Sequence, residues 1–179
     1  YDPEDKIGTA GQFIYDLNCI LDSRKRNFDI LLQLGYTSST IWYKFLPKNT
    51  TIITNMDGLE WKRSKYSKKV QKFLRYAERL GVKSSDFLIS DSIGIQSYLK
   101  EEYNVDSKYI AYGAEQFNSP DNNVISEYKL VPYKYNMLIA RLEPENNIEV
   151  ILDGVVLSQN KTPFLVVGKH DVNAFGKYL

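Results

Sequence analysis

The sequence contains one cysteine and one histidine, and its charges almost cancel, with 23 lysines and arginines against 22 aspartates and glutamates. A lone cysteine, Cys19, excludes an internal disulfide and is typical of a reducing compartment. One histidine and one cysteine cannot form a typical zinc site, so we predict no metal ion. A near-neutral chain without a known nucleic-acid-binding motif is also a poor candidate for a general nucleic-acid binder.

Long apolar runs and several catalytic signatures are missing as well. No apolar stretch approaches the length of a membrane span, and no signal-peptide pattern is present, so we predict a cytoplasmic protein. The sequence has neither a serine–histidine–acid pattern nor a Walker phosphate loop. It also lacks a Gly-x-Gly-x-x-Gly fingerprint after an early strand, which argues against a nucleotide-sugar epimerase or dehydrogenase.

What the chain does contain is a regular alternation of short apolar segments and segments with helical periodicity. This alternation predicts βαβ units and a parallel α/β sheet, in which ligands bind at the carboxyl ends of the strands. The first strand is apolar nearly throughout, which is typical of a sheet covered on both faces. The predicted helices are 9–23, 38–45, 61–83 and 92–103, and the predicted strands are 28–34, 50–54, 86–90 and 109–112.

One polar loop follows the predicted strand 50–54 and combines a carboxylate, Asp57, with a turn glycine, a tryptophan and two cations. Because this loop leaves the carboxyl end of a parallel strand, we interpret it as part of a ligand site. The alternative is an ordinary Asp-Gly turn with Trp61 packed into the core. The residues alone leave both interpretations open.

The segment 61–83 is strongly basic on one side and apolar on the other. Its apolar stripe recurs at helical spacing and consists of Val70, Phe73, Leu74, Ala77 and Leu80. This pattern predicts an amphipathic helix that packs on the core. The basic face has three interpretations: a solvated surface, attraction to anionic lipid headgroups at roughly 1 kcal/mol per cation, or nucleic-acid binding. The residues assigned to a membrane or acceptor surface are Trp61, Lys62, Arg63, Lys65 and Lys69.

A polar stretch divides the chain into two parts. Residues 116–132 carry a run of asparagine, serine, proline and aspartate, which predicts an interdomain linker. We therefore predict a first domain over 1–115 and the start of a second domain over 133–179.

Arg141 lies between a predicted buried strand and a predicted amphipathic helix. Unpaired N–H groups and the helix dipole attract anions at such a junction, and an arginine adds two-pronged recognition of phosphate oxygens. Asn146 or Asn147 is the predicted N-cap of the helix. The alternative is a surface arginine paired with Glu143 or Glu145.

A further cation, Lys169, follows the predicted strand 164–167 and leaves the same sheet edge as Arg141. From this position we hypothesise that Lys169 supplies a second positive charge to a bound phosphate group. His170, the only histidine, is interpreted as a loop residue rather than a catalytic base.

The run Ala-Arg-Leu-Glu-Pro-Glu-Asn-Asn at 140–147 resembles the donor-binding signature of retaining glycosyltransferases of the GT-B fold, the group 1 or family 4 class. The loop 55–63 and the Ala-Tyr-Gly-Ala strand exit at 111–114 resemble, more narrowly, the bacterial rhamnosyltransferases that build capsule or O-antigen polysaccharide. The resemblance runs roughly over residues 7–179. It implies two Rossmann-like parallel-sheet domains, both incomplete in this chain: an N-terminal, acceptor-side domain over 1–115 and the start of a nucleotide-sugar-binding domain over 133–179. It implies no cofactor and no metal.

The resemblance also implies roles for individual residues. Arg141 would hold the donor diphosphate, whereas Asn146 stands at the usual lysine position and remains a polar candidate for the same site. Asp57 is the candidate catalytic residue that faces the sugar or the acceptor hydroxyl, and Met56 replaces the histidine of many relatives. The candidates for the cleft and sugar site are Gly113, Glu115 and Glu145.

For activity, the resemblance implies retaining transfer of a sugar, with rhamnose as the leading candidate, from a nucleotide diphosphate donor such as dTDP-rhamnose. The acceptor would be a lipid-linked oligosaccharide, which suits a peripheral protein at the inner face of the plasma membrane. The family's first strand, its glycine-rich loop and its Glu-x7-Glu pair have no counterpart here, so we expect the chain alone to be inactive. The alternative is a non-catalytic or degenerate nucleotide- or sugar-binding module that acts as an assembly partner.

Overall fold

The computed structural model describes residues 7–121, 123–171 and 173–179. The chain forms two compact units, Tyr1–Ala114 and Glu115–Leu179. The sequence places the end of the first domain one residue later, at 115.

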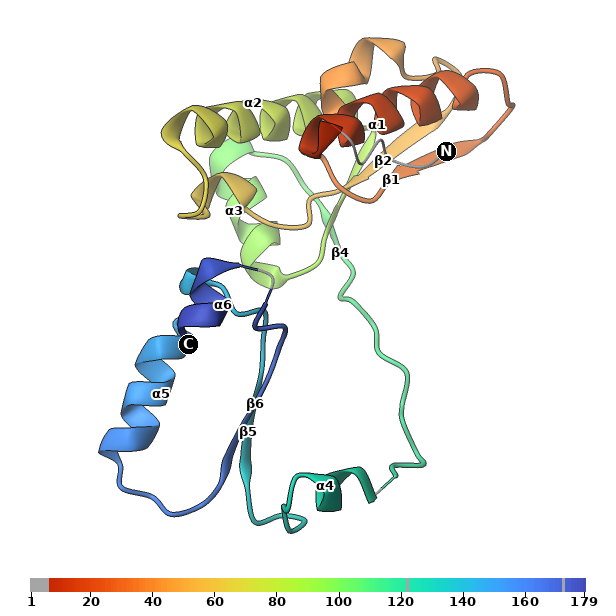
Figure 1. The fold of residues 1–179 in the computed structure, drawn as a ribbon. Helices are drawn as coiled ribbons and strands as arrows, with labels where there is room; N and C mark the ends of the chain where they lie inside the picture. Colours follow the sequence, from red (N-terminus) through yellow and green to blue (C-terminus); the bar gives the residue numbers. More distant parts are fainter. Residues whose placement is uncertain (1–6, 122, 172) are drawn as a thin grey trace. The chain divides into compact units, whose positions relative to one another are not determined.

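The first unit is built on a four-stranded parallel sheet in the order β1-β2-β3-β4 (Figure 1). Its strands are β1 (Ile30–Gln33), β2 (Thr51–Asn55), β3 (Phe87–Ser90) and β4 (Lys108–Tyr109). Apolar and β-branched residues dominate β1 and β2, which suits a pleated, half-buried surface. The parallel sheet confirms the predicted α/β class with a Rossmann-like arrangement.

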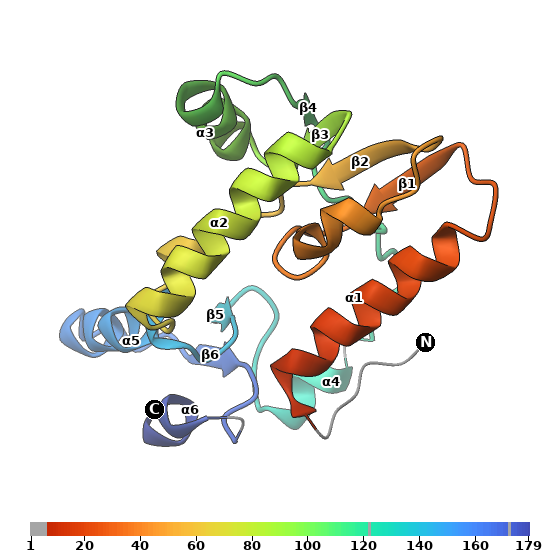
Figure 2. The ribbon, with the colours of Figure 1, turned by 90° about the horizontal axis from the view of Figure 1, so that it is seen from above.

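Helices precede and connect these strands. They are α1 (Thr9–Ser23), the 3-10 helices η2 (Thr40–Phe45) and η3 (Glu60–Lys62), α2 (Lys68–Ser84) and α3 (Ile93–Tyr103). The bounds of α1 are those that the sequence predicts. Ser92 caps α3 as expected, because its hydroxyl accepts a hydrogen bond from the backbone N–H of Ile95 (3.3 Å). The helix η2 lies between α1 and α2 and contacts both (Figure 2).

The core of this unit lies between the sheet and helices α2 and α3. Its buried members are Tyr36, Met56, Ala77, Leu88 and Leu99. Gly81 allows α2 to approach closely, because a Cβ there would lie 3.3 Å from side-chain carbons of both Thr40 and Tyr36. This contact fixes α2 against the segment that follows β1.

The apolar stripe predicted on α2 is buried only in part. Leu74, Ala77 and Leu80 are buried, whereas Val70 is 39% and Phe73 37% exposed. The ring of Phe73 packs on Phe13 of α1 with 5.8 Å between the centroids, so it covers a neighbouring helix rather than the sheet.

The strand β1 departs from its prediction. Ile30, Leu32 and Leu34 lie on one face and are 58%, 48% and 74% exposed, so the expectation of two covered faces is wrong for this strand within its unit. An apolar pattern shows that a face can be buried and does not show what buries it. The predicted helix 38–45 is a shorter 3-10 helix. The predicted strand 109–112 is wrong beyond Tyr109, because the observed strand β4 covers only Lys108–Tyr109.

The second unit holds a two-stranded parallel sheet made of β5 (Asn136–Ile139) and β6 (Phe164–Val167). The 3-10 turn η4 (Pro144–Asn146) and the helix α5 (Ile148–Leu157) connect the strands, and α6 (Ala174–Tyr178) follows β6. A short helix, α4 (Asn123–Glu127), lies within the predicted linker, so the linker is not irregular throughout.

Candidate functional site

The carboxyl edge of the first unit's sheet gathers loops from three neighbouring strands. Gly35 follows β1, Asp57 follows β2 and Asp91 follows β3. The backbone N–H of Met56 donates to the carbonyl of Ile89 (2.8 Å), which keeps β2 and β3 paired up to the start of the loop. The loop that contains Asp57 therefore lies at the edge where parallel sheets bind ligands.

Asp57 is the acidic centre of this edge. A Cβ on Gly35 would lie 3.7 Å from its Oδ2, so the carboxyl group lies against glycine backbone. Partial burial of this carboxyl group raises its pKa above the ordinary value of 3.8, and the negative charges of Glu60 and Asp91 raise it further. Asp57 holds a proton more tightly than a free aspartate, which suits a group that exchanges a hydrogen bond or a proton with a ligand hydroxyl.

The loop after Asp57 is anchored to the core. Tyr36 is fully buried, and its hydroxyl donates a hydrogen bond to the carbonyl of Gly58 (2.7 Å). Burial raises the pKa of Tyr36, and the charge of Glu78 adds to the rise, so this hydroxyl remains a donor. Gly58 has a φ of 144°, a conformation that other residues rarely adopt. Residues 57–59 form no regular turn, and the hydrogen bond from Tyr36 to Gly58 holds the loop that carries Asp57.

Further along the same loop, Trp61 is tied to a buried carboxylate of α2. Glu78 is 1% exposed, and its Oε2 accepts a hydrogen bond from Trp61 Nε1 (2.9 Å). Its Oε1 accepts hydrogen bonds from the hydroxyls of Tyr98 (2.7 Å) and Tyr103 (2.5 Å) on α3. These donors satisfy a charge that burial would otherwise penalise. We call Glu78, Trp61, Arg75, Tyr98 and Tyr103 the Glu78 cluster.

Arg75 completes the Glu78 cluster. Its guanidinium carbon lies 4.3 Å from the centroid of the Trp61 ring, and its Nη1 lies 3.7 Å from Glu78 Oε1. Arg75 also forms an ion pair with Glu102 of α3. The cluster therefore ties the Asp57 loop and α3 to α2. Sequence reasoning missed it, although one signal was present: Glu78 is an acid on an otherwise basic helix, beside its apolar stripe.

Four of the five residues predicted for a membrane or acceptor surface contact other side chains of the unit. Trp61 belongs to the Glu78 cluster, Lys62 lies 5.3 Å from the centroid of the Trp61 ring, and Arg63 pairs with a nearby glutamate (3.1 Å). Lys65 lies over a tyrosine ring, and Lys69 is exposed on α2. The role of this surface stays a prediction.

The end of β2 also presents Asn55, which the sequence predictions do not include. Asn55 is 7% exposed, its amide donates to the hydroxyl of Tyr112 (3.1 Å), and its Oδ1 has no partner among the described residues. A buried acceptor of this kind is satisfied when a ligand hydroxyl donates to it. Gly113 and Glu115 follow Tyr112 in an exposed segment, and their assignment to a cleft stays a prediction.

Arg141 and Lys169 lie at matching ends of the two strands of the second unit. Ile139 is the register partner of Val167, and the two cations each follow their strand by two residues. The loops run close together, since a Cβ on Gly168 would lie 2.4 Å from the carbonyl oxygen that precedes Arg141. Both side chains are exposed. The two cations therefore occupy matching positions just beyond the carboxyl ends of the two strands.

The loop between Arg141 and α5 is held by its own amide side chain. Asn146 Nδ2 donates to the carbonyl of Arg141 (2.6 Å), so the residue at the usual lysine position shapes the loop. Asn147 is the N-cap residue with a φ of 53°, although its side chain makes no capping hydrogen bond. Within the described residues, Arg141 forms no ion pair with a carboxylate, which leaves its guanidinium available to a ligand. Glu145 lies in η4, and its role at the sugar stays a prediction.

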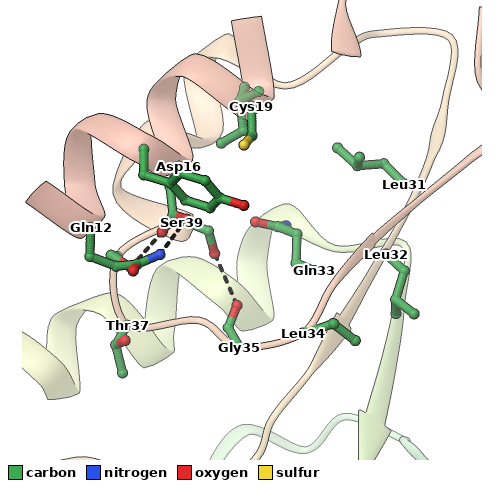
Figure 3. Close-up of a pocket in the computed structure, with 13 residues that line it drawn as sticks. Gln12, Asp16, Cys19, Leu31, Leu32, Gln33, Leu34, Gly35, Thr37 and Ser39 are labelled. Atoms are coloured by element: carbon green, nitrogen blue, oxygen red, sulfur yellow. Dashed lines mark hydrogen bonds between the residues drawn. The ribbon is translucent and has the colours of Figure 1, made fainter. Parts of the chain in front are cut away.

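A separate hollow of about 490 Å³ lies between α1 and β1 (Figure 3). Gln33 reaches from β1 toward α1; its Nε2 donates to Thr54 (3.1 Å), and its Oε1 has no partner among the described residues. Ser38 donates to Asp16 (2.5 Å) on the α1 side. None of the sequence-predicted site residues lines this hollow, and we assign it no part in the site.

Metal and membrane features were searched over the described ranges. No group of three or more histidine, cysteine, aspartate or glutamate side chains is placed there to hold a metal ion. In that same part of the chain, none of the helices is both long enough and apolar enough to cross a membrane. His170 lies in the exposed loop after β6, as predicted.

These features define an α/β protein with a Rossmann-like parallel sheet and polar side chains at the carboxyl ends of its strands. The sequence matches DUF1972, a domain of unknown function, over residues 4–115. Because this match covers more than half of the chain, the chain belongs to the DUF1972 family. The domain is associated with glycosyltransferase-like proteins. Among curated proteins, none matches the chain.

Proposed function

We propose that this protein is a retaining glycosyltransferase that transfers a sugar from a nucleotide diphosphate donor to a lipid-linked oligosaccharide. The observation that carries this proposal is the placement of Arg141 and Lys169 at register-matched ends of two neighbouring parallel strands. Two cations next to the loop that leads into a helix N-terminus complement the charge of a diphosphate. The association of DUF1972 with glycosyltransferase-like proteins supports the same class.

The proposed reaction breaks the bond between the anomeric carbon of the sugar and a diphosphate oxygen. A bond forms between the anomeric carbon and the oxygen of an acceptor hydroxyl, and the proton of that hydroxyl passes to the departing diphosphate. Negative charge grows on the departing diphosphate, so Arg141 and Lys169 stabilise the transition state more than the bound donor. Asp57 accepts the hydrogen bond of a ligand hydroxyl, because its raised pKa makes its carboxylate a better proton acceptor. The proposal requires no protein nucleophile.

The finer assignment is to a rhamnosyltransferase that uses dTDP-rhamnose and builds capsule or O-antigen polysaccharide. Its support is the resemblance of the loop 55–63 and the run 140–147 to that group. In this proposal Gly113, Glu115 and Glu145 contribute to the cleft and the sugar site. The protein then works in the cytoplasm as a peripheral protein at the inner face of the plasma membrane, where a lipid-linked acceptor is accessible.

A non-catalytic nucleotide- or sugar-binding module is the second candidate. One observation favours it: Asn146 stands at the usual lysine position and uses its amide to hold the carbonyl of Arg141. The matching position of Lys169 weighs against it, because that side chain provides a second cation from the adjacent strand.

Saturation-transfer NMR of the 179-residue chain with dTDP-rhamnose and UDP-glucose tests the proposal. We expect one donor to be preferred, with saturation reaching protons of both its nucleotide and its sugar. A folded chain that binds neither donor would contradict the proposal.

A further inference from the structure

One side of α2, which faces Trp61, carries a row of cations. The row consists of Lys68, Lys72, Arg75 and Arg79. Spacings of four, three and four residues place these side chains in one stripe along the helix. Eleven residues of helix span about 16 Å, so the row is longer than a single phosphate group.

This row borders a hollow of about 460 Å³. The other residues of its lining are Trp61, Gln71 and Tyr76. No carboxylate lines the hollow, so its lining carries four positive charges and no negative one. The two aromatic side chains give the hollow flat apolar surfaces with polar tips, which suit the region around a phosphate headgroup or a sugar ring.

Only one cation of the row is paired within the described residues. Arg75 forms ion pairs with Glu78 and Glu102, whereas Lys68, Lys72 and Arg79 form none there. Like charges along one stripe repel one another, and an anion in the hollow relieves this repulsion. The three cations without an ion pair therefore still attract an anionic ligand to the hollow.

Arg75 is also held in place before any ligand arrives. Its guanidinium lies over the Trp61 ring, and its Nη1 donates to the hydroxyl of Tyr98 (2.5 Å). Glu78, which is buried, orients both of these aromatic residues through hydrogen bonds. An arginine that is already fixed loses less conformational freedom when it binds an anion.

We propose that this hollow is a binding site for the phosphate groups of an anionic ligand. Two sources present this chemistry: the headgroups of anionic phospholipids and a soluble diphosphate. The site lies in the first unit and shares no residue with Arg141 and Lys169, so its test stands or falls independently of the donor proposal.

The test uses two probes on a starting chain that carries Arg141→Ala and Lys169→Ala, so that the proposed donor site is removed. The probes are inorganic pyrophosphate, measured by calorimetry, and phosphatidylcholine vesicles with or without phosphatidylglycerol, measured by sedimentation. The test variant is Lys72→Gln with Arg79→Gln. The control variant is Lys25→Gln with Lys48→Gln, which removes the same charge from exposed loops that precede β1 and β2. Circular dichroism confirms that both double variants are folded.

We expect the starting chain to bind at least one probe, and the test variant to lose about fivefold in affinity per cation, or about 25-fold in total. The control variant should change by less than about twofold. Binding of pyrophosphate alone identifies a soluble phosphate ligand, and binding only of vesicles with phosphatidylglycerol identifies a lipid headgroup. The proposal is overturned if neither probe binds, if vesicles without phosphatidylglycerol bind equally well, or if both variants weaken binding equally.

Discussion

The surroundings of Asp57 disfavour its negative charge, and this lowers the free energy of unfolding at neutral pH. Because burial and two nearby carboxylates raise its pKa, the folded chain binds this proton more tightly than the unfolded chain. Stability is therefore lost as the pH rises above 3.8, the ordinary value. We predict that at pH 7 Asp57→Asn unfolds at a higher urea concentration than the wild type, and that the gain disappears below pH 3.8.

Asp29→Asn is the control for this comparison, since Asp29 is exposed near the opposite end of the sheet. The control should unfold at the same urea concentration as the wild type at pH 7. A less stable Asp57→Asn at pH 7 would mean that Asp57 supports the fold instead of carrying a functional charge.

Gly81 provides a second test at the same scale. In Gly81→Ala the new methyl group would lie 3.3 Å from Tyr36 Cβ, an atom that no side-chain rotation can move away. We expect a loss of about 1–3 kcal/mol in the free energy of unfolding. Gly94→Ala on α3 is the matched case, because a Cβ there meets nothing within 4 Å, and it should gain up to about 1 kcal/mol. Urea denaturation measures the change in the free energy of unfolding in both variants. Changes of the same sign would contradict the close packing described at Gly81.

At the scale of elements, the Glu78 cluster joins three pieces of the chain. Removing its carboxylate leaves three donors without their acceptor and takes one of two ion-pair partners from Arg75, which keeps Glu102. We predict that Glu78→Ala lowers the free energy of unfolding by about 3–5 kcal/mol, measured by urea denaturation. Glu101→Ala, at an exposed position of α3, should cost less than about 0.5 kcal/mol. Similar losses in the two variants would show that the cluster does not hold these elements together.

The tyrosines of the cluster add a dependence on alkaline pH. Burial and the hydrogen bond to Glu78 raise the pKa of Tyr103 to about 12. The folded chain keeps this proton longer than the unfolded chain, so stability is intact below pH 10 and falls as the pH rises toward 12. We predict that Tyr103→Phe flattens this fall between pH 10 and 12 in urea titrations, while it lowers stability at pH 7. An unchanged slope would contradict the assignment.

The elements were predictable to the extent that each carries its own pattern. The sequence predicts α1 and β6 at their observed bounds, because helical and strand periodicities are local signals. The exposed face of β1 and the 3-10 geometry of η2 were not predicted, since they depend on neighbours and on the hydrogen-bond spacing of one turn. The short helix α4 arose in a segment whose composition indicates only a loop.

At the scale of the whole molecule, the rule for parallel sheets located Asp57, Arg141 and Lys169 at strand ends from sequence order alone. The Glu78 cluster could not be found in this way. Its hydrogen bonds join residues 17 to 25 positions apart, and partners at such distances follow from tertiary packing. The same holds for the hollow on α2. The sequence shows its cations, but the placement of Trp61 and Tyr76 beside them follows from tertiary packing.

The central claim is that Arg141 and Lys169 hold the diphosphate of a nucleotide-sugar donor. Calorimetric titration with dTDP and with thymidine tests it most directly, because the two ligands differ only in the diphosphate. Arg141→Ala and Lys169→Ala are compared with Lys161→Ala, an exposed lysine before β6 at the other end of that strand. We predict that each site variant weakens dTDP binding about 10- to 100-fold and leaves thymidine binding unchanged, with no effect in the control. Equal affinity for dTDP in all three variants and the wild type would contradict the account.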